Sequence, residues 1–122
     1  MRPLVINGDV WRVVRVPAGD PSLIDRTGTE RLATTDSERM VISVSEAVRP
    51  PLLDKVILHE VSHAITVSHG LLEPLRAVVP AYLWVTVEEW AAQLVENYAL
   101  ESARAASKVL GRPICIGGIC FD

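Results

Sequence analysis

Residues 56–65, VILHEVSHAI, place two histidines four positions apart, with a glutamate directly after the first. In a helix, His59 and His63 project from the same face one turn apart, so their imidazole nitrogens can share one tetrahedral metal ion, usually zinc. Glu60 is turned about 100° around such a helix, near the metal but not a ligand. A carboxylate in that place can take a proton from a metal-bound water and later give it to a leaving amine.

The surroundings of the motif separate a metal site from a chance match. The neighbouring positions carry no charge: Val56, Ile57, Leu58, Val61, Ser62 and Ala64. Two imidazoles and a carboxylate in a buried helix cost free energy unless they are paired or bound to a metal. A metal site therefore explains the motif better than histidines that make ordinary hydrogen bonds.

The segment VILHEVSHAI resembles the motif of the zincin metallopeptidases. The order of a strand (MVISV, residues 40–44), this helix and a second long helix is also similar to the zincin core. The resemblance covers about residues 31–110 and is greatest to small members: the minigluzincins, the domains related to ImmA and IrrE, and short phage or prophage proteins. It implies a zinc metallopeptidase in which Glu60 is the general base and acid.

A catalytic zinc needs a third protein ligand. The metzincin continuation after His63 is absent, which leaves a glutamate from a following helix, as in gluzincins. The apolar pattern that follows the ligand in gluzincins fits Glu89, whereas helical geometry puts Glu88 nearer the apolar stripe of its own helix. The resemblance favours Glu89 as the ligand and keeps Glu88 as the alternative, while either acid also complements the helix dipole. Glu96 is expected to be solvated.

The elements that must position these side chains predict an α+β fold. A small twisted N-terminal sheet, with strands at residues 10–16, 31–35 and 40–44, is expected to pack on the metal helix and a long second helix. The metal helix is predicted to follow Pro50-Pro51 and end at Gly70, and a short helical piece covers residues 72–79. Thr86 is the expected N-cap of a helix that reaches Leu110. The resemblance to zincins also implies that strand 40–44 is the edge strand that pairs with an extended substrate, with an ordinary sheet strand as the alternative.

Four more side chains have weaker claims to a role. Tyr82 or Tyr98 is a candidate donor to a developing oxyanion, with packing as the simpler role. Cys115 and Cys120 flank two glycines that permit a turn and a disulfide, but reduced thiols in a reducing cytosol are favoured. A thiolate from either cysteine as a fourth zinc ligand is a further alternative.

Length and composition narrow the class of protein. The 122 residues, 49% hydrophobic and 22% charged, suit a single globular domain over residues 1–122. The net charge of −3 gives no basic footprint, so nucleic acid is not an expected partner. No apolar run approaches the roughly 18 residues that span a bilayer, and the N-terminus has no apolar leader, so the expected location is the cytoplasm.

Two functions are compatible with this pattern. The first is a zinc metallopeptidase that acts on a peptide or protein substrate. The alternative is a zinc-binding regulatory or structural protein of phage or prophage type, with little or no peptidase activity. An open cleft with an accessible edge strand favours the enzyme, whereas a fourth protein ligand or a C-terminal tail over the metal favours the alternative.

Overall fold

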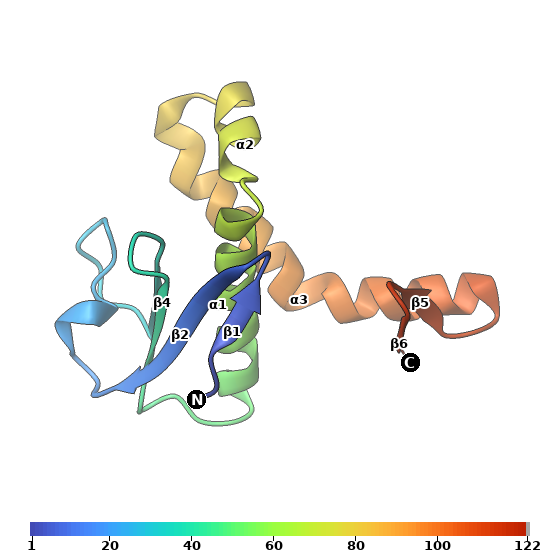
Figure 1. The fold of residues 1–122 in the computed structure, drawn as a ribbon, viewed down its shortest axis with the longest axis horizontal. Helices are drawn as coiled ribbons and strands as arrows, with labels where there is room; N and C mark the ends of the chain where they lie inside the picture. The colour runs from blue at the N-terminus through green and yellow to red at the C-terminus, as the bar shows by residue number, and fades with distance from the viewer. Residues whose placement is uncertain (122) are drawn as a thin grey trace.

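The computed structural model describes residues 1–121 and has an α+β architecture, as the sequence predicts. A small four-stranded sheet and the long helix α3 (Trp84–Leu110) both pack against the central helix α1 (Leu52–Ser68) (Figure 1). In chain order the elements are β1 (Leu4–Ile6), β2 (Asp9–Val16), the 3-10 helix η1 (Pro21–Leu23), β3 (Ala33–Asp36), β4 (Val41–Ser45), α1 (Leu52–Ser68), α2 (Leu72–Val78), the 3-10 helix η2 (Ala81–Leu83), α3 (Trp84–Leu110), β5 (Ile114–Ile116) and β6 (Ile119–Phe121).

The order of the strands corrects one prediction. The sheet runs β1-β2-β4-β3, with β2 and β4 parallel and the other two pairs antiparallel. The strand that includes most of MVISV, β4, is therefore internal, and β3 is the edge strand beside α1. Residues 42–45 of β4 are all buried, so both faces of this strand are covered.

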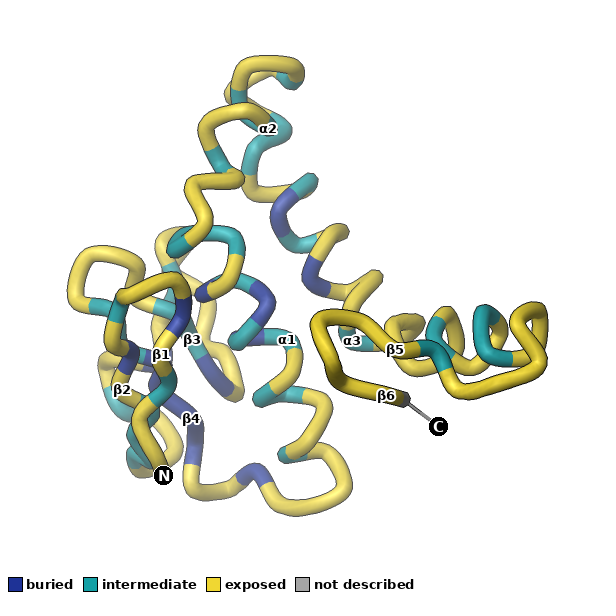
Figure 2. Tube along the Cα trace, turned by 45° about the vertical axis from the view of Figure 1, so that its right-hand side comes forward, coloured by how far each residue is buried: buried dark blue, intermediate teal, exposed yellow. Residues whose placement is uncertain are grey.

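The core lies between the sheet and α1. Trp11, Ile42 and Val44 from the strands and Ala64 from α1 have no exposed surface. The indole Nε1 of Trp11 donates a hydrogen bond of 2.8 Å to Ser68 Oγ, which joins β2 to the last turn of α1. Figure 2 shows the buried segments gathered in the sheet, in α1 and in the first half of α3. This packing fixes the sheet relative to the helix that carries the two histidines.

The predicted start of the long helix is wrong by three residues. α3 begins at Trp84 and is led in by η2, so Thr86 lies inside its first turn and is not an N-cap. The indole Nε1 of Trp84 donates to the carbonyl of Val79 at 3.0 Å, so a side-chain contact sets this end of the helix. The predicted end at Leu110 is confirmed, because Gly111 has a φ of 68° and closes the helix in the left-handed region.

The C-terminal hairpin corrects a third prediction. β5 and β6 pair with Cys115 opposite Cys120, and the two cysteines form a disulfide rather than the reduced thiols that the sequence favoured. The hairpin packs on α3, beside the half of that helix that extends away from the sheet (Figure 1). Within residues 1–121, no helix combines the length and the apolar character needed to cross a membrane.

Candidate metal centre

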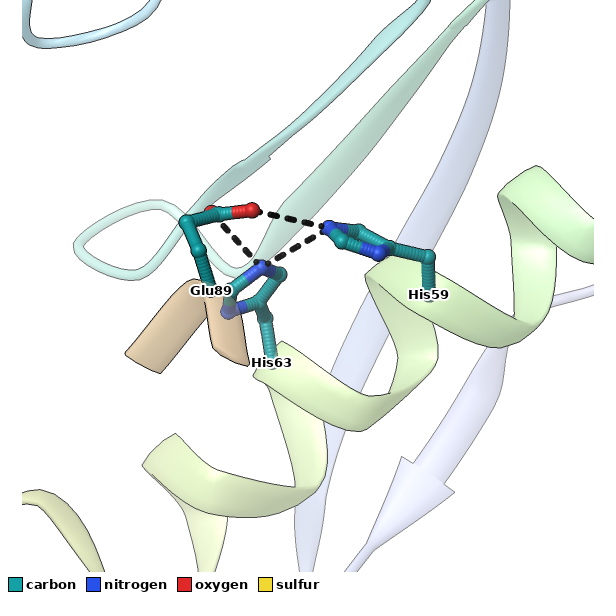
Figure 3. A group of neighbouring side chains, drawn as sticks. All are labelled: His59, His63 and Glu89. Atoms are coloured by element: carbon teal, nitrogen blue, oxygen red, sulfur yellow. Dashed lines mark hydrogen bonds and ion pairs between the residues drawn. The ribbon is translucent and has the colours of Figure 1, made fainter. Parts of the chain in front are cut away.

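Three side chains from two helices meet at one point. His59 and His63 project from α1, and Glu89 reaches them from the first part of α3 (Figure 3). The two Nε2 atoms lie 3.3 Å apart. Glu89 Oε2 is 3.2 Å from His59 Nε2, and its other oxygen is 3.1 Å from His63 Nε2. Ligand atoms about 2.0 Å from a metal at tetrahedral angles lie about 3.3 Å apart, so this spacing fits one small ion.

The charges of the group also suit a cation. The hydrogen bond with His59, and then the one with His63, holds the pKa of Glu89 well below its usual range. The hydrogen bond to Glu89 raises the pKa of His59, against the opposing effect of burial. An ionised carboxylate therefore faces two imidazoles whose nitrogens converge on the same point. This donor set, two imidazoles and one carboxylate, could hold a metal ion and is one that zinc commonly takes.

Glu96 supports the group from outside, which the sequence analysis missed. Its Oε2 lies 3.4 Å from His59 Nδ1, the ring nitrogen that points away from His63 and Glu89. A proton held on Nδ1 by Glu96 leaves the Nε2 lone pair free for a metal. The sequence did contain a signal, because Glu96 follows Glu89 by seven residues and therefore lies on the same face of α3 two turns later.

Glu60 lies next to the group and is almost completely buried, with 7% of its surface exposed. The hydroxyl of Thr35, on the edge strand β3, donates a short hydrogen bond to Glu60 Oε2. Burial raises the pKa of Glu60, and the Thr35 hydrogen bond opposes that effect. A buried carboxylate with a raised pKa is suited to accept a proton and release it again. Sequence reasoning missed Thr35, because its contact depends on how β3 packs against α1.

The structure distinguishes the two glutamates that open α3. Glu88 forms ion pairs with two arginines rather than with the histidines, at 3.2 Å from Arg76 and 3.5 Å from Arg26. Its buried charge is therefore balanced without a metal. Glu89 is the one of the pair that the structure brings to His59 and His63.

The two tyrosines considered for oxyanion binding lie elsewhere. Tyr82 is 82% exposed and Tyr98 is 53% exposed. Neither lines the groove at the metal centre.

A broad groove of about 920 Å³ contains the whole group. Its walls come from the segment between η1 and β3, from β3 and β4, and from all three helices. Within residues 1–121, β3 pairs with β4 on one side only, so its other edge is available at this groove. The hairpin that holds Cys115 and Cys120 does not line the groove.

Comparisons with known proteins add no family. No protein-family model matches the sequence, no curated protein matches it, and no solved structure matches the fold. The group of His59, His63 and Glu89, the buried Glu60 and the edge strand β3 are therefore the features that bear on the function of this chain.

Proposed function

We propose that the chain is a zincin-type, zinc-dependent metallopeptidase. The observation that carries this proposal is the convergence of His59, His63 and Glu89, with the buried carboxylate of Glu60 beside them. Two histidines one helical turn apart and a glutamate from a second helix form the donor set of a hydrolytic zinc site. The resemblance of VILHEVSHAI to the zincin motif points to the same chemistry.

Each residue has a role in this proposal. When bound, zinc would polarise the scissile carbonyl and lower the pKa of a water molecule. Glu60 takes the proton from that water and delivers it to the leaving amine, which its raised pKa favours. Thr35 orients the Glu60 carboxylate, and Glu96 keeps the His59 ring in the tautomer that presents Nε2.

The proposed substrate is an extended peptide segment. The free edge of β3 offers backbone N–H and C=O groups along the groove, and a peptide can pair with such an edge by main-chain hydrogen bonds. Because Thr35 belongs to β3 and contacts Glu60, a peptide paired there passes next to the proposed base.

The competing proposal is a zinc-binding regulatory or structural protein. It would be supported by a fourth protein ligand or by a C-terminal tail over the site. In residues 1–121 the group has three members, and the C-terminal hairpin packs along α3 outside the groove. These observations support the enzyme.

The test replaces Glu60 by glutamine in the zinc-loaded protein. We expect Glu60→Gln to bind zinc with unchanged stoichiometry and to lose at least about 100-fold of its peptide hydrolysis, because the general base is gone. Hydrolysis is measured by mass spectrometry on a digest of an unfolded protein. The matched control is Glu73→Gln, an exposed glutamate on α2. A zinc-bound wild type that cleaves nothing would favour the regulatory alternative.

A further inference from the structure

Arg31 has a fixed place on the rim of the metal centre. It lies two residues before β3, where its backbone N–H donates to the Leu23 carbonyl at 2.8 Å. The next carbonyl, that of Leu32, accepts a hydrogen bond of 2.8 Å from Ser45. Arg31 lines the large groove and also a smaller hollow of about 310 Å³, and His59 lines both as well. The backbone therefore presents this side chain to the site from a rigid position.

The guanidinium of Arg31 is also held in orientation. Its Nε donates a hydrogen bond of 2.7 Å to Asp25 Oδ2. Asp25 is itself held by the backbone N–H groups of Thr27, at 2.8 Å, and Thr29, at 3.0 Å. In the described chain, residues 1–121, the two terminal nitrogens of Arg31 have no hydrogen-bond partner, and the side chain is 52% exposed. A guanidinium that is already oriented loses little entropy when it binds a carboxylate.

Arg31 shares the lining of both hollows with His59 and Glu60, and the charges of the proposed metal centre act on it. The hydrogen bond to Asp25 is the main cause that raises the pKa of Arg31, and the charges of Glu89 and Glu60 add to it. Arg26 and Arg76, in the same groove, are committed to Glu88. Once a divalent cation neutralises Glu89, the positive charge of Arg31 is available to attract an anion.

We propose that Arg31 is a specificity-determining residue that binds a carboxylate of the substrate, either a C-terminal carboxylate or an acidic side chain. This inference rests on the proposed metal centre and gives the peptidase a substrate class. A planar guanidinium with two free nitrogens can bind a carboxylate through two parallel hydrogen bonds. Substrates with a negative charge close to the scissile bond are therefore preferred.

The first experiment measures binding alone, so that it does not depend on peptidase activity. The probes are the monohydroxamates of succinic, glutaric and adipic acid, each paired with its terminal amide. The hydroxamate binds zinc, and the chain length varies the distance from the zinc to the carboxylate. At one chain length we expect the acid to bind the zinc-loaded wild type at least about tenfold more tightly than the amide.

Variants of Arg31 identify the residue responsible. We expect Arg31→Gln to remove the preference for the acid while leaving the affinity for the amides unchanged, and Arg31→Lys to keep part of it. Asp25 keeps its hydrogen bonds from Thr27 and Thr29 in these variants, so the loop retains its main support. The control is Arg104→Gln, which removes one positive charge from α3 outside both hollows. An absent preference at every chain length, absent binding, or a preference that survives Arg31→Gln overturns the proposal.

The second experiment distinguishes the two sources of carboxylate. One peptide sequence is made with a free C-terminus, with a C-terminal amide, and as an amide with a single internal glutamate. Affinity for zinc-loaded Glu60→Gln is measured by calorimetry. Tighter binding of the free acid identifies a C-terminal anchor, and tighter binding of the glutamate peptide identifies a side-chain anchor. Equal binding of all three contradicts the proposal. If the hydroxamate acids are preferred but no peptide is cleaved by the wild type, the peptidase fails while the carboxylate site stands.

Discussion

The Thr35 hydroxyl donates a hydrogen bond to the Glu60 carboxylate and also lies 3.3 Å from the Glu60 carbonyl oxygen. One side chain of the edge strand β3 thus contacts both the backbone and the carboxylate of the proposed general base on α1. Thr35 thus joins the strand proposed to bind the peptide to the group proposed to move its proton.

The first prediction concerns Thr35→Val, which removes the hydroxyl and keeps the shape of the side chain. Burial raises the pKa of Glu60 and the Thr35 hydrogen bond opposes that rise, so its loss should raise the pKa further. We expect the acid limb of the pH–kcat/KM profile to move to higher pH by about one unit, with zinc affinity unchanged.

The control for this variant comes from the same strand. Thr34 donates its hydroxyl to the carbonyl of Ser22, on the side away from Glu60. Thr34→Val should leave the acid limb where it is in the wild type. An acid limb that stays in place in Thr35→Val would show that this threonine does not tune the base.

The second prediction concerns Glu96, which lies 3.4 Å from His59 Nδ1. Glu96→Ala should weaken zinc binding by about tenfold or more, because the His59 ring loses the partner that fixes its tautomer and orientation. Affinity is measured by competition with a chromogenic chelator. Glu101→Ala, an exposed glutamate further along α3, serves as the control and should bind zinc like the wild type. Equal zinc affinities of both variants would show that Glu96 does not support the zinc site.

The third prediction concerns the pH dependence of the metal-free protein. Glu89 raises the pKa of His59, so the stability from this pair is complete below about pH 6.5, the pKa of an unfolded histidine, and disappears as the pH rises through the higher folded value. Glu89 has a lowered pKa, so its share is present above about pH 4.3 and falls away in acid. The pair thus stabilises the protein most between about pH 5 and 6.5.

Denaturant unfolding of the chelator-treated protein checks this window. The difference in unfolding free energy between the wild type and His59→Gln should shrink as the pH is raised from 6 to 9. His69→Gln, at the exposed C-cap of α1, should show no such trend. A difference that grows with pH would contradict the ion pair between His59 and Glu89.

Zinc and protons compete for the same histidine nitrogens. Binding of a metal needs the neutral imidazole, and the raised pKa of His59 means that protons begin to compete at a higher pH than they would for free histidine. Zinc affinity should therefore still increase as the pH rises above 6.5.

Local patterns in the sequence predicted the parts of the fold that depend on local physics. The β-branched run at residues 10–16, the apolar helix around His59 and the left-handed Gly111 are all set by near neighbours along the chain. The position of β4 inside the sheet is not set by near neighbours along the chain, because a short apolar run looks the same in a central strand and at an edge.

In the candidate site, too, local contacts could be predicted from the sequence and tertiary contacts could not. The spacing of His59 and His63 is a local property of one helix, so the sequence was sufficient to place them together. The choice between Glu88 and Glu89 depends on which neighbours pack against α3, and two arginines from distant segments pair with Glu88. The contact between Thr35 and Glu60 depends on tertiary packing too, and no spacing rule predicts it.

In the proposed site, Glu89 holds zinc together with the two histidines. The most direct measurement is zinc content after purification without added metal, by elemental analysis of the wild type, Glu89→Ala and Glu88→Ala. We expect one zinc per chain in the wild type and in folded Glu88→Ala, and loss of zinc from Glu89→Ala while its helical circular dichroism is retained. Zinc retained by Glu89→Ala and lost from a folded Glu88→Ala would contradict this assignment.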